Sequence, residues 1–168
     1  MLIAPPEFLV NLCQPWNKFY SDSKLAETLV QFAHTAALVV AGGIAIATDR
    51  NTLRAYAWSD DVRNHHLAEL NFLHRTVVTG LALSVISGLA MFAADVETFW
   101  GSWIFWVKMI LVAILLANGA RMLGVENKLR ADPAVTSPQW GKLRFNAITS
   151  IGLWLTTTLA GLALLNYS

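Results

Sequence analysis

One histidine and one lysine stand inside long apolar runs, where polar side chains are costly. His34 lies in "QFAHTAALVV" and Lys108 lies in "WIFWVKMILV". One imidazole nitrogen can ligate a metal or accept a proton while the other donates to an orienting group. A lysine amine can pair with a carboxylate. These two residues, with Met109 next to Lys108, are therefore the first candidates for a buried site.

The chemistry of His34 has several interpretations at this stage. The imidazole could ligate a haem, a chlorin or a metal ion, it could transfer protons, or it could be a structural histidine bonded to Gln31, a threonine or a backbone carbonyl. Gln31 and Glu27 precede His34 by three and seven residues, so all three share one face of a helix. We expect Gln31 and Glu27 to form an outer set of partners or a proton path.

Composition places these residues in a membrane. The chain has 168 residues, of which 55% are hydrophobic and 14% are charged, whereas about a quarter of the residues in a soluble domain are charged. A net charge of +1 disfavours a nucleic-acid partner, which needs clustered basic charge. Cys13 is the only cysteine, which excludes an intrachain disulfide or a cysteine metal cluster. No CxxCH motif is present, so a bound haem would be noncovalent, b-type haem.

Four stretches are long enough to cross about 30 Å of hydrocarbon as helices of about 20 residues. No strand-like alternation competes with them, and only helices or closed barrels satisfy their backbone in lipid. We predict an all-α integral membrane four-helix bundle over residues 25–168. Residues 1–24 mix apolar and polar residues and are predicted to form an interfacial helix. The predicted spans are residues 25–48, 70–94, 101–124 and 142–166.

Basic residues predict the orientation of the bundle. They concentrate in the connections between the first and second spans and between the third and fourth, whereas the turn between the second and third spans is acidic. By the positive-inside rule, both termini lie outside the bacterial inner (cytoplasmic) membrane. The basic residues are Arg50, Arg54, Arg63, Arg75, Arg121, Lys128, Arg130, Lys142 and Arg144.

Depth along the helices sorts the polar residues into two layers. At 1.5 Å per residue, His34 lies about 13 Å and Lys108 about 10 Å below the outer surface, which predicts a shared outer layer. His74 lies near the inner surface, about 15 Å from the level of His34, so the two histidines do not share a haem. The inner layer, which also includes Asp49 at the end of the first span, is either a charged rim or a separate haem site with His74, His66 and Arg121.

The second span carries Gly80, Ser84 and Gly88 at a spacing of four residues. Small residues at this spacing permit close contact between helices, and we predict a packing role for them.

Several short sequence segments together resemble those of a known group of membrane proteins. The first-span histidine is followed by "TDR", the second span reads "TGLALSVISGLAMF", and "WIFWVKMILVAILLANGARM" and "AGLALL" come later. This layout resembles small bacterial four-helix membrane proteins similar to the copper resistance protein D domain and, more distantly, HemJ-type protoporphyrinogen oxidases. The resemblance implies that His34 and Lys108 form a functional pair near haem, porphyrin or copper.

We therefore predict an inner-membrane protein that binds b-type haem or a related tetrapyrrole and transfers electrons with a quinone or within a larger membrane redox complex. His34 is the expected axial ligand and metal-binding residue, and Lys108 the partner of a propionate or a quinone. Two alternatives stay open: a cofactor-free structural or assembly subunit, and copper or porphyrin handling. The predicted cofactor residues are His34, Lys108, Met109, Gln31, His74 and Arg121.

Overall fold

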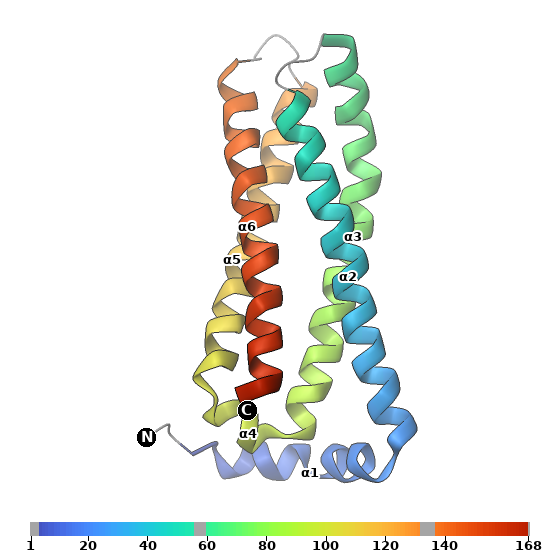
Figure 1. Ribbon diagram of the computed structural model, residues 1–168, viewed down its shortest axis with the longest axis vertical. Helices are drawn as coiled ribbons and strands as arrows, with labels where there is room; N and C mark the ends of the chain where they lie inside the picture. Colours follow the sequence, from blue (N-terminus) through green and yellow to red (C-terminus); the bar gives the residue numbers. More distant parts are fainter. Residues whose placement is uncertain (1–3, 56–59, 132–136, 168) are drawn as a thin grey trace.

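The computed structural model describes residues 4–55, 60–131 and 137–167, and this part of the chain is helical without strands. The all-α prediction is therefore confirmed. Figure 1 shows four long helices side by side, with a shorter helix lying across one end. The elements are α1 (Glu7–Asp22), α2 (Lys24–Ala55), α3 (Asp60–Ala94), α4 (Val96–Gly101), α5 (Trp103–Ala131) and α6 (Ser137–Tyr167).

Within the described residues, four helices are long and apolar enough to cross a membrane. These segments are Lys24–Arg54, His65–Ala94, Trp103–Ala131 and Gln139–Asn166. At the end of the bundle where α1 lies, their bounds agree with the predicted spans. At the far end the helices run several residues further than predicted, because charged residues continue the helix beyond its apolar part. The predicted link between the first two spans includes residues 56–59, which lie outside the described residues.

The long helices pack in the order α3, α2, α6, α5. Helix α2 packs along both α3 and α6, and α5 packs along α6. Within the described residues, α3 and α5 make no comparable packed pair. The contact between α2 and α3 depends on Gly80, since a Cβ atom there would lie 2.8 Å from the Cβ of Ala41. The small-residue stripe therefore has the packing role that the sequence predicts, at least at Gly80.

Two groups of buried apolar side chains hold the bundle together. The central group joins α2, α5 and α6 through Ala41, Ala45, Leu115 and Trp154. The far-end group joins α3, α5 and α6, and it consists of Leu67, Leu70, Met122, Leu129, Trp140, Leu143 and Ala147. The outward faces of the long helices are also apolar, with residues such as Val39, Ile86, Ile110 and Leu159 exposed. Such a surface suits a lipid environment rather than water.

Helix α1 is attached to the end of α3 by side-chain hydrogen bonds. The indole Nε1 of Trp16 donates to the carbonyl of Ala90 at 2.8 Å, and the amide of Asn17 donates to the carbonyl of Ala94. These bonds lay α1 across the end of the bundle (Figure 1). The start of α1 and the end of α6 lie at this same end, which we call the α1 end.

The short helix α4 was not predicted from the sequence. It begins after Asp95, whose carboxylate accepts a hydrogen bond from the backbone N–H of Thr98 at 3.2 Å. An aspartate at this position is a common N-terminal helix signal. Helix α4 turns the chain from α3 to α5 and brings Phe99 to the cavity described below.

Candidate functional site

A cavity lies between the long helices in the half of the bundle nearer α1, and we call it the His34 cavity. It encloses about 810 Å³ of empty space and is partly open to the outside. Its walls are mostly apolar, with His34, Ser84, Lys108 and Thr157 as the polar members.

The imidazole of His34 has a defined orientation. Its Nδ1 atom lies 2.8 Å from the backbone carbonyl oxygen of Ser84 and 3.1 Å from the hydroxyl oxygen of Ser87. A carbonyl oxygen only accepts hydrogen bonds, so Nδ1 carries the proton of the neutral ring and donates to it. Nε2 then keeps its lone pair. A histidine held by a carbonyl on one nitrogen and free on the other has the arrangement found for metal-ligating histidines.

Helix α3 also makes room for the imidazole ring. A Cβ atom at Gly88 would lie 3.1 Å from Cε1 of His34 and 3.5 Å from its Nδ1. Any larger residue at this position would press on the ring while it is bonded to Ser84. Ser84 and Gly88, one turn apart, therefore together set the position of His34.

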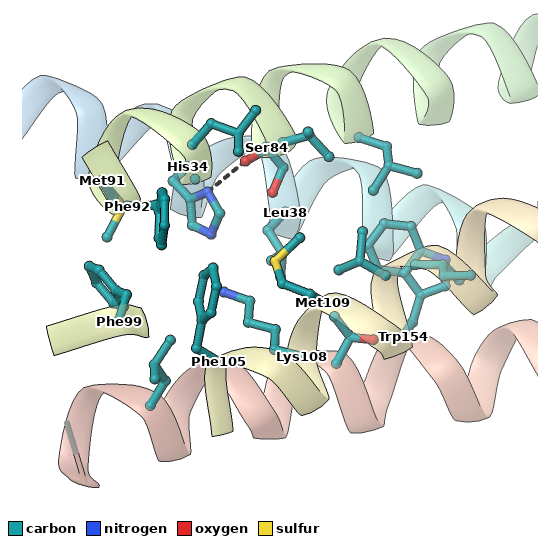
Figure 2. Close-up of a pocket in the computed structure, with 18 residues that line it drawn as sticks. His34, Leu38, Ser84, Met91, Phe92, Phe99, Phe105, Lys108, Met109 and Trp154 are labelled. Atoms are coloured by element: carbon teal, nitrogen blue, oxygen red, sulfur yellow. Dashed lines mark hydrogen bonds between the residues drawn. The ribbon is translucent and has the colours of Figure 1, made fainter. Parts of the chain in front are cut away.

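Lys108 projects from α5 toward the same space. Figure 2 shows its amine and the imidazole of His34 pointing toward one another across the cavity. The side chain of Lys108 is half-buried, and among the described residues no hydrogen-bond or ion-pair partner is found for its amine. A Cβ atom on Gly161 would lie 3.5 Å from its Nζ atom, so glycine leaves space beside the amine. A half-buried cation without a partner favours an anionic group at this point.

The remaining walls supply aromatic rings, sulfur atoms and one more polar group. Phe92 and Phe105 stack with their ring centroids 5.1 Å apart and their planes 13° apart. Met91 and Met109 also line the cavity (Figure 2). Thr157 is only 4% exposed, and its hydroxyl oxygen has no hydrogen-bond partner among the described residues. These groups suit a flat apolar ligand with a few polar substituents.

The arrangement limits the chemistry of the His34 cavity. Within the described residues, no group of three or more histidine, cysteine, aspartate or glutamate side chains could hold a metal ion. A metal at His34 would therefore need most of its ligands from elsewhere, as in a tetrapyrrole, or from methionine sulfur. The cavity thus offers one nitrogen ligand, one cation and apolar walls.

The structure brings together some of the residues singled out from the sequence. His34, Lys108 and Met109 share the His34 cavity. Gln31 does not reach it: its side chain is exposed, and its amide lies 3.4 Å from Glu27. Glu27 in turn pairs with Lys24 at 2.9 Å.

The three residues predicted for an inner haem site lie away from the His34 cavity. His74 lines a second cavity nearer the far end, consistent with the expectation that it does not share a ligand with His34. Arg121 is exposed. His66, the suggested companion of His74, is buried and its Nε2 atom lies 3.0 Å from the hydroxyl of Thr52.

Sequence reasoning missed two kinds of residue. Ser84 and Gly88 were interpreted as packing residues only, although they also position His34. Asp49 was assigned to a charged rim, yet it is only 2% exposed, and Glu126 is 1% exposed. A signal for Glu126 was present, since it follows Met122 by four residues and precedes Leu129 by three, which places it on the buried face of α5.

Comparisons with known proteins found no matching family model, no matching curated protein and no matching solved structure. The function therefore has to be argued from the two cavities and the residues that line them.

Proposed function

We propose that this chain is a multi-pass protein of the bacterial inner membrane whose His34 cavity binds b-type haem or a related tetrapyrrole for electron transfer. The observation that carries the proposal is the orientation of His34. Its Nδ1 atom is bonded to the Ser84 carbonyl at 2.8 Å, which leaves Nε2 available as an axial ligand inside an apolar cavity.

Other features of the cavity support the same ligand class. The amine of Lys108 faces His34 (Figure 2) and would pair with a propionate. The stacked rings of Phe92 and Phe105 would cover part of a flat macrocycle, and the unpartnered hydroxyl of Thr157 could donate to a polar substituent. Met109 or Lys108, which line the same cavity, would supply a second ligand to the iron. When bound, a haem supplies reversible one-electron chemistry at its iron.

The charge distribution and the shape of the bundle support this membrane placement. Basic residues gather at the far end of the bundle, which would then face the cytoplasm. Both termini and α1 would lie on the periplasmic side. Helix α1 exposes Phe8, Leu12 and Phe19, whose spacing places them on one helical face, and an exposed apolar face suits a helix lying in the membrane interface. A larger membrane redox complex or a quinone would be the electron partner.

The test is purification in detergent followed by absorption spectroscopy and pigment analysis. We expect a Soret band in the wild-type protein, or after haem supplementation, and its loss in His34→Ala. The matched control is His65→Ala, because His65 is exposed with its Nε2 atom 3.3 Å from Glu69 and lies outside both cavities. This control should keep the band.

Two results would overturn the proposal. The first is a folded wild-type protein that gains no Soret band after haem supplementation. The second is stoichiometric copper without pigment, which would assign the cavity to copper handling through His34, Met91 and Met109, since thioether sulfur suits Cu(I). Thermal unfolding of each variant shows that a loss of binding is not a loss of fold.

A second function is favoured by one observation. The apolar face of α1 formed by Phe8, Leu12 and Phe19 is exposed, and such a face also suits contact with a larger membrane protein. In that case the chain is a cofactor-free structural or assembly subunit. Affinity purification from native membranes distinguishes the two, because a subunit would retain a stoichiometric protein partner and carry no pigment.

A further inference from the structure

A second cavity lies nearer the far end of the bundle, and we call it the His74 cavity. It encloses about 840 Å³ of partly open empty space between α3 and α5, and α2 and α6 form its back wall. Its polar lining residues are Thr48, Asp49, His74 and Ser150, and the other lining residues are apolar or glycine. Leu81, Leu115 and Trp154 line both cavities and form the layer between them.

Asp49 has one buried carboxylate oxygen that lacks a hydrogen-bond donor. Its residue is 2% exposed, and the Ser150 hydroxyl hydrogen-bonds to its carboxylate. The second carboxylate oxygen, Oδ2, has no hydrogen-bond partner among the described residues. A carboxylate can accept several hydrogen bonds, and leaving one of its oxygens buried and unsatisfied is unfavourable. The cavity therefore presents an open position for a hydrogen-bond donor.

His74, on α3, is a second polar residue that lines the cavity. Its Nδ1 atom lies 3.4 Å from Oε2 of Glu126 and has no hydrogen-bond partner among the described residues. Glu126 itself is 1% exposed and lies 3.8 Å from Nη2 of Arg130. A neutral imidazole has one acceptor nitrogen, so Asp49 on α2 and His74 on α3 each bring an acceptor to the same apolar space.

The route into the cavity narrows the ligand class. Val78 on α3 and Leu116 on α5 both line the cavity and are exposed, so the cavity opens at the seam between these two helices. Val77, Val78, Leu116 and Gly119 line this seam within the apolar segments of α3 and α5. A molecule that enters here comes from the hydrocarbon, where a neutral head group is far less costly than an ammonium ion.

We propose that the His74 cavity binds a lipid-soluble hydroquinone. Its ring hydroxyls donate hydrogen bonds to Asp49 and His74, and its ring and chain lie against the apolar seam. When the Asp49 carboxylate is ionised, the bond to it is charge-assisted, which makes it stronger than a neutral one. This assignment uses only the His74 cavity and does not require a ligand in the His34 cavity.

The test is an anaerobic binding titration of the purified protein with tetramethylhydroquinone and with the corresponding quinone. The quinone has acceptors but no hydroxyl donors, so we expect it to bind at least about tenfold more weakly. Asp49→Asn adds a competing amide donor and should weaken hydroquinone binding about tenfold. Equal binding of quinone and hydroquinone would overturn the proposal.

A matched pair of glycine variants tests the location. A Cβ atom at Gly119 or at Gly124, both on α5, meets nothing within 4 Å, but only Gly119 lines the cavity. We expect Gly119→Leu to abolish hydroquinone binding and Gly124→Leu to leave it unchanged. Loss in both variants, or in neither, would contradict this site.

Two further measurements separate this proposal from its rivals. His34→Ala should lose the Soret band and keep hydroquinone binding, whereas Gly119→Leu should show the reverse, so each proposal can fail alone. Decylamine is the probe for an amphipathic cation. Decylamine binding that is lost in Asp49→Asn, with displacement of the hydroquinone at decylamine concentrations below those at which the hydroquinone itself binds, would show that the site prefers a cation. The hydroquinone assignment would then be wrong.

Discussion

The Nδ1 atom of His34 lies 2.8 Å from the carbonyl oxygen of Ser84, and this bond joins α2 to α3 in the half of the bundle nearer α1. A backbone carbonyl cannot be removed by a side-chain change, so it fixes the imidazole through the fold itself. The other ring nitrogen of His34, Nε2, faces Lys108 across the cavity (Figure 2). The site therefore depends on the separation of α2 and α3 as much as on the identity of His34.

Gly88→Ala tests this dependence directly. A Cβ atom there would lie 3.1 Å from Cε1 of His34, so the ring must shift away from Ser84. Loss of an orienting interaction at a metal ligand lowers affinity by about 10–100-fold. We expect a loss in this range for haem, measured by titration of the haem-free protein and followed at the Soret band.

Gly161→Ala is the matched control for Gly88→Ala. Its new Cβ atom would lie 3.5 Å from Nζ of Lys108, which is ordinary van der Waals contact with the flexible end of a side chain. We expect little change in haem affinity. A larger loss in Gly161→Ala than in Gly88→Ala would mean that the position of Lys108, rather than that of His34, controls binding.

The shared level of His34 and Lys108 in the bundle could be predicted, because the depth of a residue along a helix can be counted from the start of its span. Each residue adds 1.5 Å, so two residues in different spans can be compared without knowing which helices touch. The result holds in the structure, where both line one cavity. The spacing along one helix did not predict the position of Gln31 correctly. Gln31 shares a helix face with His34, yet its side chain is exposed.

The far-end cluster could not be predicted in the same way. Asp49 and Glu126 lie near span ends, where charged residues usually meet water, so the sequence indicated a rim position for Asp49 and no role for Glu126. Their burial depends on which helices flank them, and that is a property of packing between distant segments. The order α3, α2, α6, α5 has no signature in any single helix, and neither cavity could be placed before it was known.

Gly80→Ala is expected to destabilise the contact between α2 and α3. Its Cβ would lie 2.8 Å from Cβ of Ala41 and 3.3 Å from the carbonyl oxygen of Ala37, and neither atom can move without moving α2. Overpacking of this kind costs about 1–3 kcal/mol. The measurement is the free energy of unfolding in mixed micelles.

The control for Gly80→Ala is Gly152→Ala on α6. A Cβ atom at Gly152 meets nothing within 4 Å, and alanine is the better helix former by up to about 1 kcal/mol. We expect this variant to be as stable as the wild type or more stable. Equal destabilisation by both alanines would show that the close approach of α2 and α3 at Gly80 is not important for stability.

Cys13 tests the proposed orientation, because it is the only cysteine and lies on α1 at the α1 end of the bundle. A membrane-impermeant maleimide added to intact cells should label it. In a Cys13→Ser background, Lys128→Cys places a thiol at an exposed position near the end of α5, at the far end, and should react only after the membrane is permeabilised. The opposite pattern would place both termini in the cytoplasm.

Arg130→Met tests the charged network beside the His74 cavity. Arg130 donates a hydrogen bond of 2.7 Å from Nη2 to the carbonyl of Leu67 and lies 3.8 Å from the buried Glu126. Methionine keeps much of the apolar contact but removes both interactions. Hydrogen bonds from charged groups contribute about 1.5–3 kcal/mol, so we expect a loss of about 2 kcal/mol in the free energy of unfolding.

The contribution of Glu126 can be isolated by repeating Arg130→Met in a Glu126→Gln background. The bond to Leu67 is lost in both backgrounds, whereas the interaction with a buried negative charge exists only when residue 126 is glutamate. Arg130→Met should therefore cost less in the Gln background, with a coupling of about 0.5 kcal/mol or more. Additive losses would mean that Arg130 stabilises the far end only through its hydrogen bond to Leu67 on α3. Lys128→Met, at an exposed position on the same helix, should change the stability by less than about 0.5 kcal/mol.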